Sequence, residues 1–240
     1  MSKAKSKNEL YEVIHNYFQP SAGQIPVLIV DTGTLIDLEE IAKQKRSGEA
    51  PHKIAGKFFS NLGNMADYVI FTRGIYNEVM EHGCKGRKNG RSEIGKEICD
   101  LTERYHHGSK CLLEELNFDY HYSESYHVEV DKLQEIIKSL HEEVNGGKKG
   151  GKKVNGKDPI SENDLELVNS AIKLAVKSLF EFRLRQEKSG DVPSAIGGTY
   201  RTAVISPDSH IYRPINAFIT RPEGVSYRDY LQAFNPREYI

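Results

Sequence analysis

The chain has 240 residues, of which 38% are hydrophobic and 28% are charged, and its mean hydropathy is −0.56. This composition is typical of a globular protein with a polar surface, and no apolar stretch is long enough to span a bilayer, so we expect no membrane partner. The net charge of −1 excludes a strongly basic, passive nucleic-acid binder, so any contact with nucleic acid must come from local patches.

The cysteines and the N-terminus indicate where the protein works. Cys84, Cys99 and Cys111 are odd in number and widely spaced, so they predict neither a disulfide framework nor a zinc site. The N-terminal residues include lysines but no apolar segment of the kind that a secretory signal needs. We therefore expect a reducing, cytoplasmic location.

Helices and strands are predicted to alternate in the first half of the chain. Residues 25–30 are apolar throughout, which is typical of a strand buried on both faces of a parallel sheet. The other elements predicted here are helices over 8–18, 34–46 and 51–64, a strand over 68–71, and a helix after that strand with Ile75, Val79 and Met80 on its inner side.

The second half continues this alternation. Residues 92–116 and 131–144 are predicted to be helical, and the Gly/Lys-rich stretch 145–158 is predicted to be a flexible loop. A long helix over 161–187, a strand over 201–205, a last strand over 215–220 and a last short helix over 227–234 complete the chain. This order of elements predicts an α/β fold with a mainly parallel sheet.

Two carboxylates follow predicted strands directly. Asp31 comes after residues 25–30, and Asp208 lies three residues after Ile205. In open α/β sheets the ligand crevice lies outside the carboxyl ends of the strands. Asp31 and Asp208 are therefore expected to meet over such a crevice.

Two further carboxylates are expected to reach the same crevice from helices. Glu78 lies beside the apolar side of the helix that follows the second strand, and Asp164 lies in the first turn of the long helix. Four clustered carboxylates repel one another unless a cation neutralises them, and hard cations such as Mg²⁺ prefer oxygen ligands. Asp164 begins the stripe that is expected to pack on the sheet, which contains Val168, Ala171, Ile172, Ala175, Leu179 and Phe182.

The segments around these carboxylates resemble the PIN-domain ribonucleases, a family that includes VapC-like toxins. The matching segments are VLIVDTGTLIDL, TRGIYNEVMEH, SENDLELVNSAIKLA and AVISPDSHI, which occur in the family's order between residues 27 and 211. The resemblance implies a three-layer α/β/α sandwich and hydrolysis of RNA to 5′-phosphate products with Mg²⁺ or Mn²⁺. It implies that the catalytic metal ligands are Asp31, Glu78, Asp164 and Asp208, supported by Thr32 and Ser206.

The resemblance also divides the chain. It implies a helical N-terminal extension over 1–22 and a PIN-like domain over 23–240, with an inserted region over 84–158. RNA would contact Arg73, and Lys148 and Lys152 of the Gly/Lys-rich loop. The sequence leaves open whether a protein regulator such as an antitoxin binds the enzyme and whether it forms a homodimer. One departure from the family is Gly33, which stands where many members have Asn.

Each carboxylate also has an explanation that needs no catalysis. Asp31 could cap a helix, Ser161 and Asp164 fit a capping box, Glu78 could be solvated, and Asp208 could be a turn residue.

Rival functions for the chain remain. The triplet Asp31-Thr32-Gly33, with the glycine motif at 195–198, fits an aspartic protease, although that fold is nearly all β. A haloacid dehalogenase-type phosphohydrolase needs a second Asp two residues after the first, where this chain has Gly33, so that class is less favoured. A catalytically inactive PIN-like binding scaffold is the remaining alternative.

Overall fold

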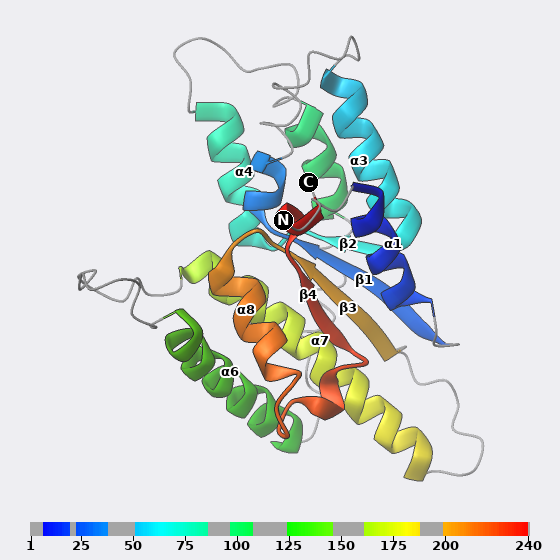
Figure 1. The fold of residues 1–240 in the computed structure, drawn as a ribbon, viewed down its shortest axis with the longest axis vertical. Coiled ribbons are helices and arrows are strands. Elements are labelled where there is room, and N and C mark those ends of the chain that lie inside the picture. The colour runs from blue at the N-terminus through cyan, green and yellow to red at the C-terminus, as the bar shows by residue number, and fades with distance from the viewer. Residues whose placement is uncertain are drawn as a thin grey trace, which may run out of the picture.

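The computed structural model describes residues 7–19, 23–37, 51–85, 97–107, 124–145, 161–187 and 199–239. Its centre is a sheet of four parallel strands in the order β2-β1-β3-β4 (Figure 1). The strands are β1 (Gln24–Val30), β2 (Tyr68–Ile70), β3 (Thr199–Ile205) and β4 (Leu231–Phe234). The predicted α/β class and the parallel sheet are confirmed.

Helices surround this sheet. Short helical stretches cover residues 32–37 and 97–107. The longer helices and the 3₁₀ turns are α1 (Lys7–Phe18), α3 (Pro51–Met65), α4 (Arg73–Lys85), α6 (Glu124–Asn145), α7 (Glu162–Glu187), α8 (Ser209–Phe218), η2 (Val225–Tyr227) and η3 (Pro236–Tyr239).

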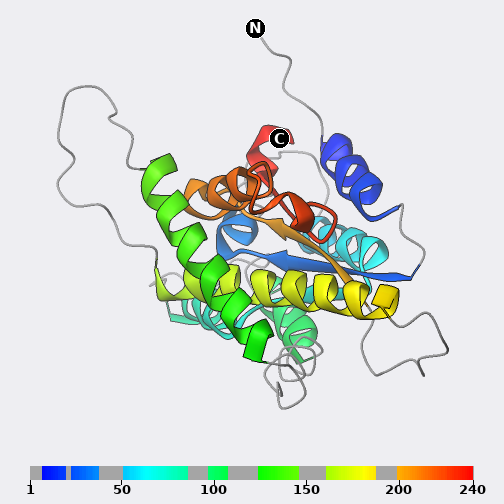
Figure 2. The ribbon, with the colours of Figure 1, turned by 90° about the horizontal axis from the view of Figure 1, so that it is seen from below.

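The sheet lies between α1 on one face and α7 on the other, as Figure 2 shows. Neighbouring residues of a strand point to opposite faces. Tyr200 of β3 lies under the Lys177 ammonium of α7, with the nitrogen 5.3 Å from the ring centre. Arg201, the next residue, lies over the ring of Tyr17 in α1, with its guanidinium carbon 4.4 Å from the ring centre. Helices on both faces are what a three-layer arrangement requires.

The N-terminal helix α1 packs directly on the sheet. The Tyr17 hydroxyl donates a hydrogen bond to the Thr202 carbonyl (3.2 Å), and the Tyr17 ring lies 5.8 Å from the ring of Phe234. Leu10 and Ile14 of the same helix are buried. The region expected to be an extension therefore contributes to the same hydrophobic core as the sheet.

The described parts of the region 84–158 also join this core. Ile98 and Cys99 of the 97–107 helix are buried, as is Tyr126 of α6. The loop over 146–158, with Lys148 and Lys152, lies outside the described residues, and so do the later part of the 34–46 helix, both ends of 92–116 and the motif at 195–198.

Two predictions near the C-terminus are wrong. Residues 209–218 form α8 where a strand over 215–220 was expected, because Asp208 caps the helix and Ile211, Ile215 and Phe218 bury one helical face. Residues 231–234 form β4 where a short helix over 227–234 was expected, since they pair with β3. Short apolar runs fit either structure, and here the neighbouring strand decides.

Helix α7 also corrects one detail. The predicted stripe is buried from Val168 to Leu179, but Phe182 is 43% exposed. The helix has 26 residues and β3 has seven, so by standard rises α7 is roughly 15 Å longer than the strand it covers. Its last turns therefore extend beyond the sheet.

The search for membrane spans covered the residues that the structure describes. None of their helices combines the length and the apolar character needed to cross a bilayer.

Candidate functional site

The carboxyl ends of β1 and β3 bring Asp31 and Ser206 together. The Asp31 backbone N–H and the Thr34 hydroxyl both donate to the Ile205 carbonyl, each at 3.0 Å. The Ser206 hydroxyl donates to Asp31 Oδ2 at 2.8 Å, and the Asp31 residue is only 6% exposed. The predicted supporting role of Ser206 therefore has a physical basis in this direct hydrogen bond.

Asp208 follows on the same loop and begins α8. Its backbone N–H donates to Ser206 Oγ (3.0 Å), and its Oδ1 accepts from the His210 backbone N–H (2.7 Å). The carboxylate thus caps α8, whereas the non-catalytic explanation predicted from the sequence was a turn residue. The His210 ring faces His141 of α6, with Nδ1 and Nε2 2.5 Å apart, which ties the first turn of α8 to α6.

Gly33 and Pro207 pack against each other beside Asp31. A Cβ atom at position 33 would lie 2.8 Å from Pro207 Cγ and 3.2 Å from Asp31 Oδ2. An asparagine would therefore require Pro207 to move. Position 33, where many PIN-domain proteins have Asn, is a glycine here, and Pro207 occupies the space beside it.

Glu78 joins three elements near the end of β1. The Thr32 hydroxyl donates to Glu78 Oε2 at 2.7 Å, and the Asn163 amide of α7 donates to Glu78 Oε1. Because Glu78 belongs to α4, these bonds connect the residue after Asp31 with α4 and α7. Glu78 is therefore held in place on both carboxylate oxygens.

The start of α7 contributes Asp164 and a second carboxylate. The Asp164 backbone N–H donates to Ser161 Oγ at 3.1 Å, which is the predicted helix cap. Glu166 Oε2 accepts from the Gly74 backbone N–H at 2.8 Å and so caps the start of α4. A Cβ atom on Gly74 would lie 2.7 Å from Asn163 Cγ, so this glycine allows α4 and α7 to approach closely.

Asn163 and Glu166 were missed from the sequence. Their spacing of three residues places both on one side of α7 and is the only signal that they act together. The short polar run at the start of the helix otherwise predicts an ordinary solvated first turn.

The carboxylates influence one another electrostatically. Burial raises the pKa of Asp31 to about 7; the Ser206 hydrogen bond opposes this shift, and the charges of Asp164 and Asp208 add to it. Burial also raises the pKa of Asp164, opposed by the Ser161 hydrogen bond and assisted by the charges of Asp208 and Glu78. The four predicted residues therefore lie in one electrostatic neighbourhood.

The donors in this neighbourhood are oxygens, which suit Mg²⁺ or Mn²⁺. Within the described ranges, no lysine or arginine forms an ion pair with any of the four carboxylates. Their spacing is open, since no three Asp, Glu, His or Cys side chains of the described chain lie close enough to hold one ion together. Mg²⁺ keeps several of its waters and needs only one or two carboxylates, so the donor set fits this ion in chemistry.

Arg73, the predicted RNA contact that the structure describes, is the first residue of α4. It is exposed and follows the end of β2, at the same edge of the sheet as Asp31 and Asp208.

The parallel α/β sheet is unlike the nearly all-β fold of aspartic proteases, so it does not favour that reading of the Asp31-Thr32-Gly33 triplet. Comparison of the chain with protein-family models, with curated proteins and with solved structures finds no match. Assignment to the PIN-domain family is therefore a proposal that depends on the four segments and the site.

Proposed function

We propose that this protein is a metal-dependent ribonuclease of the PIN-domain type. The observation that carries the proposal is Asp31, a carboxyl group buried at the end of β1 beside Ser206 and raised in pKa partly by Asp164 and Asp208. Keeping a carboxylate in such a place destabilises the fold, and binding a cation would offset that cost. Crevices at the carboxyl ends of parallel strands are also the usual ligand sites of α/β proteins.

The residues have separate roles in this proposal. Asp31, Glu78, Asp164 and Asp208 would hold Mg²⁺ or Mn²⁺, one or two of them directly and the others through the waters that the ion keeps. The ion would supply an activated water and neutralise charge on the phosphodiester. Ser206 orients Asp31 through its 2.8 Å hydrogen bond. Thr32 and Asn163 hold Glu78 from two sides, which fixes the position of its carboxylate.

A non-catalytic binding scaffold is the second candidate. It is favoured by the open spacing of the described carboxylates and by the structural bonds that Glu78 and Asp208 already make. In that case the carboxylates would stabilise the junctions between strands and helices without binding a metal.

Cleavage of a labelled, mixed-sequence RNA pool with Mg²⁺ or Mn²⁺, with and without EDTA, separates the two candidates. Asp31→Asn should reduce the rate by at least about 100-fold, because it removes a charged oxygen ligand while it keeps the shape of the side chain. Asp131→Asn, on the exposed surface of α6, is the matched control and should retain the rate.

Each result has a clear meaning. Metal-dependent cleavage that Asp31→Asn abolishes and Asp131→Asn retains supports the ribonuclease. A folded wild-type protein that neither cleaves RNA nor binds Mn²⁺ in a calorimetric titration overturns it and supports the scaffold.

A further inference from the structure

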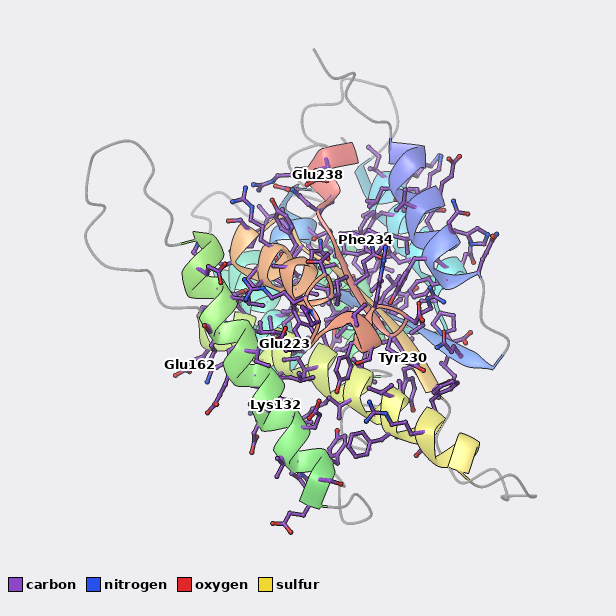
Figure 3. The ribbon with its side chains drawn as sticks, turned by 60° about the horizontal axis from the view of Figure 1, so that its bottom comes forward. Lys132, Glu162, Glu223, Tyr230, Phe234 and Glu238 are labelled. Carbon is purple, nitrogen blue, oxygen red and sulfur yellow. The ribbon has the colours of Figure 1, made fainter. Side chains whose placement is uncertain are left out.

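A site with several carboxylates repels the polyanion that a ribonuclease must bind, so cations are needed beside it. The end of β4 supplies one of them. Phe234 ends β4 opposite Ile205 of β3, and the Ser206 backbone N–H donates to the Phe234 carbonyl at 3.0 Å. The chain then forms η3, and Figure 3 labels Phe234 at the end of β4 and Glu238 in η3. Because η3 follows the carboxyl end of β4, Arg237 lies at the same edge of the sheet as Asp31 and Asp208.

The Arg237 guanidinium is held in a defined orientation by Asp37. Arg237 Nε lies 2.6 Å from Asp37 Oδ2, and its Nη2 lies 2.8 Å from Asp37 Oδ1. Asp37 ends the described part of the helix that begins directly after Asp31. This two-point contact is the geometry in which arginine is least free to rotate. It connects η3, which follows β4, to the helix after β1.

We propose that Arg237 binds a phosphate of the RNA strand and positions it beside the carboxylates of the site. This inference depends on the proposed ribonuclease function and names a residue that contacts its substrate.

The guanidinium has donors to spare for this contact. It carries five N–H groups, and its side-chain bonds within the described chain are the two to Asp37. The Arg237 side chain is 60% exposed, whereas that of Asp37 is 18% exposed, so the outer edge of the guanidinium faces solvent. The hydrogen bond to Asp37 raises the pKa of Arg237, burial opposes this shift, and the charges of Asp37 and Asp208 add to it.

A second ion pair supplies the comparison. Arg221 Nη2 lies 2.7 Å from both carboxylate oxygens of Glu143 on α6, and the Arg221 side chain is 42% exposed. Arg221 lies beyond the C-terminal end of α8, whereas Asp208 caps the N-terminal end of that helix. The two arginines therefore make similar exposed ion pairs, but only Arg237 lies at the carboxyl edge of the sheet.

The test measures the affinity of Arg237→Gln and Arg221→Gln for a short fluorescein-labelled single-stranded RNA by fluorescence anisotropy. Ca²⁺ replaces Mg²⁺ so that the RNA stays intact, and the titration is repeated over a range of salt concentrations. Arg237→Gln should bind about five- to tenfold more weakly than wild type and should reduce the slope of log affinity against log salt by about 0.7, the value for one phosphate contact on a single strand. Arg221→Gln should change neither quantity.

The outcomes separate this inference from the proposed function. If the wild type binds and cleaves RNA but Arg237→Gln has the wild-type affinity and salt slope, the inference is wrong and the ribonuclease stands. If the wild type binds no RNA, both are wrong. Thermal unfolding of the two variants should show equally small losses, since each removes one exposed ion pair, so weaker binding cannot be attributed to unfolding.

Discussion

The candidate site has two sides that use the same residue types differently. On the strand side, which consists of Asp31, Ser206 and Asp208, the buried Asp31 carboxyl receives one side-chain hydrogen bond from a hydroxyl group. On the helix side, which consists of Glu78, Asn163, Asp164 and Glu166, carboxylates bridge elements: Glu78 contacts Thr32 and Asn163, and Glu166 caps α4.

This difference separates Glu166, which stabilises the fold by capping a helix, from Asp31, whose charged form costs stability. Glu166 satisfies a backbone N–H at a helix start, where negative charge is favourable. The pKa of Asp31 is raised, so the surrounding protein disfavours its charged form. A group that destabilises the fold in its ionised form is a candidate for function, and the strand side is therefore the better place to look for a bound cation.

The largest effect on stability should come from the charge of Asp31. Its pKa is about 7 in the folded protein and 3.8 in the reference state, so the folded protein holds the proton more tightly. The contribution of Asp31 to the free energy of unfolding is therefore greatest below about pH 4, and it is lost as the pH rises through 7. We expect a loss of roughly 2–4 kcal/mol across that window without metal, measured by urea unfolding in EDTA.

Asp31→Asn provides the control for this pH dependence. The variant should be more stable than the wild type at pH 8 in EDTA and should lack this part of the pH dependence. Added Mg²⁺ should stabilise the wild type more than the variant. If the stability of the two proteins had the same pH dependence, the fold would not disfavour the charged form of Asp31.

The next effect tests the close approach on the helix side. Gly74→Ala would place a methyl group 2.7 Å from Asn163 Cγ and 2.9 Å from Asn163 Cβ, so α4 and α7 must move apart. We expect a loss of about 2 kcal/mol in the free energy of unfolding. Gly56→Ala in α3 is the matched control, because nothing lies within 4 Å of its added Cβ, and it should be neutral or stabilising by up to about 1 kcal/mol.

A Gly74→Ala variant as stable as the wild type would show that the α4–α7 junction is adaptable. The close approach of Gly74 to Asn163 would then not limit which residues can stand at this junction.

The smallest effect compares two serine hydroxyls. Ser206→Ala should cost about 1 kcal/mol and raise the pKa of Asp31 further, because the hydrogen bond that lowers it is lost. Ser161→Ala should cost a similar amount by removing a helix cap, but it should leave the pKa of Asp31 unchanged. The pKa would be read from the pH dependence of stability in each variant, and an equal shift in both would contradict the assignment of Ser206.

Some of the fold could be predicted because local sequence patterns decide it. The apolar run before Asp31 forms β1, and the 3.6-residue periodicity after Ser161 forms α7. The shared position of Asp31 and Asp208 could be predicted because residues at the ends of parallel strands lie at one edge of the sheet.

Other features could not be predicted because they depend on partners distant in sequence. Residues 231–234 become a strand because β3 offers a free edge, and the side chain of Asn216 in α8 then bonds the backbone of Ala233 on the outer side of β4. The contact of Asn163 with Glu78 spans 85 residues, and that of Arg237 with Asp37 spans 200. No local pattern reports such contacts.

The sequence by itself determined the α/β class, most helices and strands, and the shared sheet edge of Asp31 and Asp208, since periodicity and strand ends are local properties. Only the tertiary structure decided the order of the strands, the partners of each carboxylate, and which carboxyl groups have a raised pKa. Burial and the distances between charges set those energies, and both depend on how segments far apart in the chain pack against one another.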